Sequence, residues 1–86
     1  MERWLGEVRG VLIALTDFVP PEALSIPSRL IEHGEAPDGL VQMAWVIANH
    51  GVRVPSRIIE AIYELGGQIN DPAYLPTNLR DFAADA

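Results

Sequence analysis

The side chains most able to do chemistry follow one another closely at Glu32, His33, Glu35 and Asp38. Imidazole and carboxylate groups bind metals when they converge from two elements or lie four residues apart on one helix. A site of His33, Glu35 and His50 is one interpretation, but the glycine between the first two interrupts the helix. Alternatively, both histidines lie near helix C-termini, where a partly charged imidazole interacts favourably with the dipole. This second interpretation explains both positions, so we predict no metal site.

Residues that would support catalysis are missing from the sequence. The chain has no cysteine, no glycine-rich phosphate loop and no serine flanked by the glycines of a nucleophile elbow. Its three serines, Ser25, Ser28 and Ser56, suit helix starts. A chain of 86 residues also has little room for a cleft in which paired acid and base groups acquire shifted pKa values. We therefore predict no enzymatic activity, no catalytic residues and no cofactor.

The charged residues indicate the class of partner. Twelve carboxylates stand against six arginines and no lysine, which gives a formal net charge of −6. Affinity for phosphate backbones comes mainly from Lys and Arg that displace counterions, so a nucleic acid is not expected as a partner. An acidic protein instead complements a basic protein surface and gains association rate from electrostatic steering.

Two groups of acids are the candidate partner-binding residues. The first group is Glu32, Glu35 and Asp38, which lie in a stretch without a basic residue, and the second is Glu60 and Glu64. For each group the alternative is a solvated face that only keeps a small protein soluble. The sequence leaves both interpretations open.

An amphipathic helix is expected at the start of the chain. Apolar residues recur at intervals of three and four from Glu2 to Phe18, and a Pro-Pro pair follows and ends the helix. Gly6 and Gly10 share one face of this helix. They lie either at a close helix contact or on an exposed face that tolerates glycine.

Residues 26–32 and 54–60 are similar in sequence, with Pro-Ser-Arg followed by two aliphatic residues and Glu in both. Proline suits the first helical position, so both copies predict helix starts, at Pro27 and Pro55. A solenoid needs about three or more units to bury a continuous core, and a third copy is missing. The copies are either two helix starts of similar sequence or an internal duplication that has diverged.

The segment between the copies predicts the most buried helix. Pro37 opens it, the run from Leu40 to Ala48 is apolar on nearly every side, and Gly51 supplies the left-handed residue just past its end. A fourth helix is expected from Pro55 to about Leu65, where two glycines stop it.

The tail carries turn signals and a last short helical segment from Thr77 to Ala83. Three apolar side chains should dock it on the other helices: Leu75, Leu79 and Phe82. We expect the final Ala-Asp-Ala to fray.

These elements predict an all-α fold, with residues 1–86 forming a single domain. The architecture is a small bundle of four main helices with a short C-terminal helical segment. Trp45 is expected in the core, whereas Trp4 suits either the core or an interface, where tryptophan is common among hot spots. Exposed ion pairs of Glu60 are expected with nearby arginines: Arg29, Arg53 and Arg57.

The N-terminus lacks the apolar stretch of a signal peptide, and its first residues carry charges at positions 2, 3, 7 and 9. The longest apolar runs are far shorter than the roughly 20 residues that span a bilayer. We therefore predict a cytoplasmic location and no membrane segment.

From about Ser28 to Gly67, a short apolar helix leads into His-Gly-Glu at residues 33–35, a buried helix, a Val-Pro turn at residues 54–55 and an Ile-rich helix that ends in Gly. This order resembles the small helical MafI-type immunity proteins of bacteria. The resemblance implies an all-α fold and inhibitory binding of a cognate toxin inside the producing cell.

Two other function classes compete with toxin neutralisation. The first is an accessory or scaffolding subunit that oligomerises through apolar helix faces, for example as a dimer. The second is a helix-turn-helix regulator, which suits short helices joined by glycine turns. No helix here concentrates the Arg, Lys, Asn or Gln of a recognition helix, so the regulator ranks last.

Overall fold

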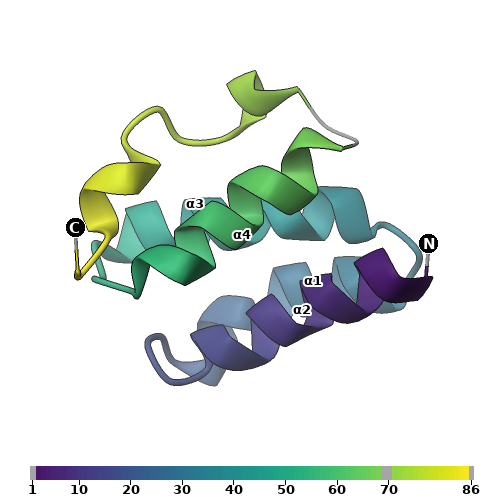
Figure 1. Cartoon of the computed structure of the whole chain (residues 1–86). Coiled ribbons are helices and arrows are strands. Elements are labelled where there is room, and N and C mark those ends of the chain that lie inside the picture. The colour runs from purple at the N-terminus through teal and green to yellow at the C-terminus, as the bar shows by residue number, and fades with distance from the viewer. Residues whose placement is uncertain (1, 69–70, 86) are drawn as a thin grey trace.

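The structure is a computed structural model that describes residues 2–68 and 71–85 (Figure 1). It confirms the predicted all-α bundle with a short C-terminal helical segment. The four α-helices are α1 (Glu2–Leu15), α2 (Ser25–Glu32), α3 (Ala36–His50) and α4 (Ser56–Gly67). Three short 3-10 helices complete the described chain: η1 (Pro21–Leu24), η2 (Pro72–Tyr74) and η3 (Leu79–Phe82).

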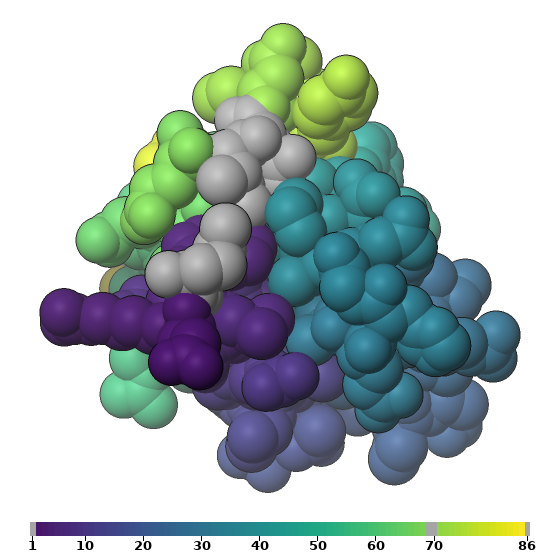
Figure 2. Space-filling model, turned by 90° about the vertical axis from the view of Figure 1, so that its right-hand side faces the viewer, coloured from purple at the N-terminus to yellow at the C-terminus, as the bar shows by residue number. Residues whose placement is uncertain are grey.

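Consecutive helices run antiparallel, and α1 and α2 lie on one side of α3 and α4 (Figure 1). The C-terminal segment crosses the opposite side of α3 and α4, which η3 contacts. The start of α1, the end of α2, the start of α3 and the end of α4 therefore share one end of the molecule. Figure 2 views this end directly.

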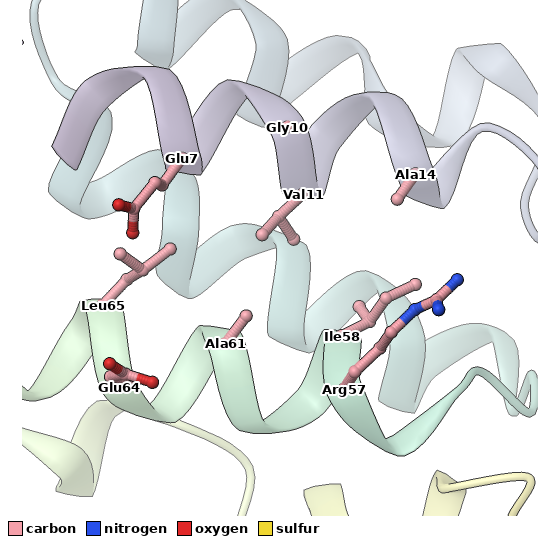
Figure 3. Close-up of a pocket in the computed structure, with 9 residues that line it drawn as sticks. All are labelled: Glu7, Gly10, Val11, Ala14, Arg57, Ile58, Ala61, Glu64 and Leu65. Atoms are coloured by element: carbon pink, nitrogen blue, oxygen red, sulfur yellow. The ribbon is translucent and has the colours of Figure 1, made fainter. Parts of the chain in front are cut away.

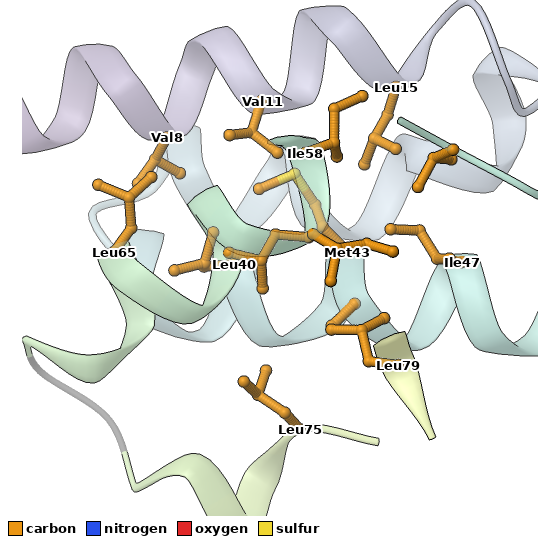
Figure 4. Close-up of a cluster of buried hydrophobic side chains, with 14 of the residues drawn as sticks. Val8, Val11, Leu15, Leu40, Met43, Ile47, Ile58, Leu65, Leu75 and Leu79 are labelled. Carbon is orange, nitrogen blue, oxygen red and sulfur yellow. The ribbon is translucent and has the colours of Figure 1, made fainter. Parts of the chain in front are cut away.

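The core forms where the inner faces of the four helices and the C-terminal segment meet (Figure 4). α3 contributes the most buried residues of any helix, as its apolar sequence predicted. Ten of the core residues stand out in Figure 4: Val8, Val11, Leu15, Leu40, Met43, Ile47, Ile58, Leu65, Leu75 and Leu79.

α1 ends at Leu15 and not at Phe18, because the chain tightens into a turn after its last α-helical residue. The backbone N–H of Thr16 bonds the carbonyl of Ile13, three residues back, and the Thr16 hydroxyl donates to the same oxygen at 2.6 Å. Phe18 is left exposed, whereas Val19 turns into the core.

The two glycines of α1 are exposed, and a Cβ added at Gly6 or Gly10 would meet no atom within 4 Å. They therefore lie on an open face and not at a close helix contact. Gly51, just past α3, has a φ of 62°, as predicted for the residue that ends this helix.

The two similar segments occupy different structural positions. Pro27 is the third residue of α2, because this helix begins at Ser25 directly after η1, whereas Pro55 immediately precedes α4. The residue before each proline also differs, since Ile26 is 60% exposed and Val54 is fully buried. The prediction that both prolines open helices is therefore correct for Pro55 and wrong for Pro27.

α4 runs through both glycines that were expected to stop it. Gly66 is buried, and a Cβ added there would lie 3.6 Å from Cδ2 of Leu40, whereas Gly67 is exposed.

The C-terminal segment is fixed to the loop before α4. The N–H of Val54 donates to the Phe82 carbonyl at 3.0 Å, and the N–H of Ala84 donates to the Val54 carbonyl at 2.8 Å. Asp85 accepts from the backbone N–H of Ser56 at 2.7 Å and from its hydroxyl at 3.1 Å. These bonds lower the pKa of Asp85. The prediction that the last residues fray is therefore wrong for Asp85, while Ala86 lies outside the described residues.

Leu75 and Leu79 are buried and Phe82 is half-buried, so the predicted docking residues are confirmed. The helices of residues 2–68 and 71–85 include none with the length and apolar character needed to cross a bilayer.

Candidate functional site

The first group of predicted acids surrounds the tight turn between α2 and α3. Gly34 has a φ of 80° and follows the end of α2. Its N–H bonds the carbonyl of Ile31, and the next N–H, that of Glu35, bonds the carbonyl of Leu30 at 2.8 Å. This pair of bonds is the Schellman arrangement, which satisfies carbonyls at a helix end and reverses the chain.

This turn brings the three acids together on the surface. Glu32 is the last residue of α2, Glu35 immediately precedes α3, and Asp38 lies in the first turn of α3. All three side chains are exposed, and none takes part in an ion pair within the described residues. We call Glu32, Glu35 and Asp38 the acidic turn.

The acidic turn belongs to a larger negative surface at the end of the molecule shown in Figure 2. The start of α1 and the last turn of α4 add further carboxylates to this end. Six of the twelve carboxylates of the chain therefore gather there, with two arginines, Arg3 in the first turn of α1 and Arg29 in the last turn of α2. We call this surface the acidic end; its acids are Glu2, Glu7, Glu32, Glu35, Asp38 and Glu64.

Arg3 lies 3.6 Å from Glu7 as an exposed pair within α1, so it offsets one carboxylate of the acidic end. The opposite end carries three arginines, Arg53, Arg57 and Arg80, among its acids. Six acids and two arginines give the acidic end a charge of −4, against −2 for the rest of the chain.

The two acids of the second predicted group, Glu60 and Glu64, lie one turn apart on α4 and differ in their contacts. Glu60 accepts two hydrogen bonds from Arg80, at 2.9 Å from Nε and 3.0 Å from Nη2, and they lower the pKa of Glu60. The guanidinium also lies 3.9 Å from the centre of the Tyr63 ring. The partner of Glu60 is therefore Arg80 and not the expected Arg29, Arg53 or Arg57, because the C-terminal segment folds back onto α4.

Glu64 lies instead in a shallow groove between α1 and α4 (Figure 3). The groove has a volume of about 330 Å³ and an apolar floor. Glu7 and Glu64 lie toward one end of it and Arg57 toward the other. The floor and walls include small residues, which keep the groove open: Gly10, Ala14 and Ala61.

A second hollow lies on the outer face of α3, next to the acidic turn. It has a volume of about 420 Å³ and is lined by Leu30, Asp38, Val41, Gln42 and Tyr74. We call it the α3 hollow.

Trp45 stands beside this hollow, one turn after Val41, and it is 40% exposed, so its predicted place in the core is wrong. Its indole N–H donates to the main-chain carbonyl of Tyr74 at 2.8 Å. Trp45 shares a stripe of α3 with exposed polar residues at positions 38, 42 and 49, and this spacing is the sequence signal for its exposure. Trp4 is half-buried and its indole N–H donates to the Leu65 carbonyl at 3.0 Å.

Both histidines lie at helix C-termini, as the dipole interpretation predicted: His33 directly after α2 and His50 as the last residue of α3. Within residues 2–68 and 71–85, no three His, Asp or Glu side chains are placed to hold a metal ion together.

No protein-family model, curated protein or solved structure matches the chain.

Proposed function

We propose that this chain is a non-enzymatic immunity protein that binds a cognate bacterial toxin stoichiometrically inside the producing cell. The observation that carries the proposal is the acidic end, where half of the carboxylates gather with two arginines, of which Arg3 is paired with Glu7. Many toxic effectors are nucleases, whose substrate grooves are basic. An acidic protein surface that fills such a groove blocks the substrate.

The exposed carboxylates of the acidic turn suit this role for two reasons. Their oxygens are open to arginine and lysine side chains of a partner, since no ion pair of the described chain occupies them. A concentrated negative surface also speeds association with a basic protein, and this effect falls as ionic strength rises. We assign the contact to Glu32, Glu35 and Asp38, with Glu64 at its edge.

Glu60 is better assigned to the fold than to the contact. Its carboxylate is held by Arg80, so binding a partner there would first require that pair to break. The proposed binding residues are therefore four of the six acids of the acidic end, Glu32, Glu35, Asp38 and Glu64, without Glu60.

Inspection of the neighbouring genes for a toxin domain, followed by co-expression with the domain found there, tests the proposal. The wild-type chain should restore growth, and reversal of Glu32, Glu35 and Asp38 to Arg should abolish the rescue while circular dichroism shows an unchanged helical fold. A folded wild-type chain that gives no rescue, or a reversed variant that rescues fully, would contradict the proposal.

A second candidate is an accessory subunit that forms a dimer through the groove between α1 and α4. The separation of Glu7 and Glu64 from Arg57 along this groove favours it. A two-fold axis across the groove would place the acids of one copy against the arginine of the other. Sedimentation analysis distinguishes the two candidates. The accessory subunit must be a dimer, and the Arg57→Glu variant should raise the dissociation constant of that dimer.

A further inference from the structure

The α3 hollow has an exposed aromatic side chain that the fold does not use. Tyr74 is 64% exposed, and it is its main-chain carbonyl, not its ring, that accepts the hydrogen bond from Trp45. The indole N–H of Trp45 is satisfied by that bond, while much of the ring stays open to solvent. Two aromatic residues thus stand together at the surface, and residues of this type dominate the energetics of protein interfaces.

The apolar surface extends from these rings across α2. Leu30 and Val41 line the α3 hollow, and Ile26 lies one turn before Leu30 and is 60% exposed. Residues four apart lie on the same side of a helix, so Ile26 continues the apolar wall formed by Leu30. The aliphatic part of a side chain bound in the hollow would therefore contact side chains from both α2 and α3.

The described residues that line the hollow include a negative charge and no positive charge. Asp38 contributes a carboxylate to its lining, and no arginine of the described chain is among the lining residues. The other two carboxylates of the acidic turn lie just before Asp38 in the chain. A cation in the hollow would find a carboxylate partner and no repelling charge among the residues that line it.

The chain already holds one arginine with the same two chemical partners. The guanidinium of Arg80 forms two hydrogen bonds to the carboxylate of Glu60 and lies over the ring of Tyr63. A planar guanidinium can stack on an aromatic ring while it donates to a carboxylate, which a compact ammonium does less well. The α3 hollow presents this pair of groups again, as Tyr74 and Asp38, without an arginine from the chain itself.

We propose that the α3 hollow is the subsite that receives an arginine side chain of the protein partner. The guanidinium stacks on Tyr74 and pairs with Asp38, while its aliphatic stem contacts Leu30 and Val41. This inference deepens the proposed function and rests on it in one respect, namely that the partner is a basic protein.

The test is an NMR titration of the whole chain with the peptide acetyl-Gly-Arg-Gly-amide. The matched control replaces arginine by citrulline, which has nearly the same shape and no charge, and a second peptide carries lysine. We expect saturable shifts of the Trp45 indole N–H and the Gln42 amide with the arginine peptide. The lysine peptide should bind more weakly and the citrulline peptide more weakly still.

Variants assign the two contacts separately. Tyr74→Ala and Asp38→Asn should each raise the Kd of the arginine peptide about two- to fivefold, as expected for an exposed cation–π contact or ion pair. Tyr74→Phe keeps the ring and should bind like the wild-type chain. Phe18→Ala and Asp17→Asn change an exposed aromatic and an acid far from the hollow, so they should leave the Kd unchanged.

Equal shifts with the arginine and citrulline peptides would overturn the inference. So would shifts spread evenly over acids outside the hollow, or an unchanged Kd in both Tyr74→Ala and Asp38→Asn. If the hollow fails this test while the chain still neutralises its toxin, the proposed function stands on the rest of the acidic end. If arginine binds in the hollow and no toxin is neutralised, the toxin assignment falls and the subsite stands.

Discussion

Replacement of glycine by alanine should have opposite effects at two helical positions. Gly10 lies in α1, where an added Cβ would meet no atom within 4 Å. Gly39 lies in α3, where an added Cβ would be 2.9 Å from Cγ1 of Ile31 and 3.0 Å from the carbonyl oxygen of Pro27. The missing side chain at Gly39 therefore lets α2 and α3 pack closely.

The magnitudes follow from these two environments. Alanine is favoured over glycine in an exposed helix by about 1 kcal/mol, so Gly10→Ala should raise the free energy of unfolding by roughly that amount. At Gly39 the same gain is opposed by overpacking, which costs about 1–3 kcal/mol. Neither neighbour yields easily, since Ile31 is buried and the other contact is backbone. We expect Gly39→Ala to lower the free energy of unfolding by up to about 2 kcal/mol.

Urea unfolding followed by circular dichroism measures both variants, with Gly6→Ala as a second exposed control. Gly6→Ala should behave like Gly10→Ala, because its Cβ is also unobstructed. If Gly39→Ala were stabilised as much as these two, α2 and α3 could not pack as closely as the structure places them.

Three further predictions concern the C-terminal segment. Leu79 is fully buried, so Leu79→Ala should lower the free energy of unfolding by about 2–5 kcal/mol in the same urea assay; an effect near zero would mean that the segment is not part of the core. The pKa of Asp85 is lowered by its bonds from Ser56, so its contribution is present above the unfolded pKa of about 4 and is lost as the pH falls through the folded pKa. Asp85→Asn should therefore flatten the loss of stability on acidification, and an unchanged pH profile would refute this. Arg80→Gln should bring the pKa of Glu60 back up toward its ordinary value in an NMR titration, because the bonds from Arg80 lower it, and no change would contradict the pairing.

Local sequence chemistry predicted the helices well where the signal and its effect lie close together. Pro37 at the start of α3 and Gly51 after its end are examples, because each acts on the backbone of its own turn. The end of α4 could not be predicted in this way. Gly66 is helical and buried beside Leu40, a residue of another helix, and this neighbour cannot be read from the local sequence.

In the candidate site, too, features set by neighbouring residues were predictable and features set by contacts between distant segments were not. The acidic turn was predicted because its three acids lie within seven residues and share one glycine turn. The pairing of Glu60 with Arg80 depends on how the C-terminal segment folds back, which residue spacing does not specify. The apolar character of Trp45 predicts a core position, whereas its place on the polar stripe of α3 leaves it 40% exposed.

The central claim is that the acidic turn binds a basic toxin, and calorimetric titration with the toxin domain that the chain neutralises in the co-expression test examines it most directly. One variant neutralises the acidic turn as Glu32→Gln, Glu35→Gln and Asp38→Asn. A matched control removes the same charge from exposed acids elsewhere in the bundle, as Asp17→Asn, Glu22→Gln and Asp81→Asn.

We predict a one-to-one complex whose Kd rises with salt, rises on neutralisation of the acidic turn and changes little in the control. A complex that both variants weaken equally would show that only net charge matters. Failure of the wild-type chain to bind, or binding unaffected by loss of the acidic turn, would contradict the claim.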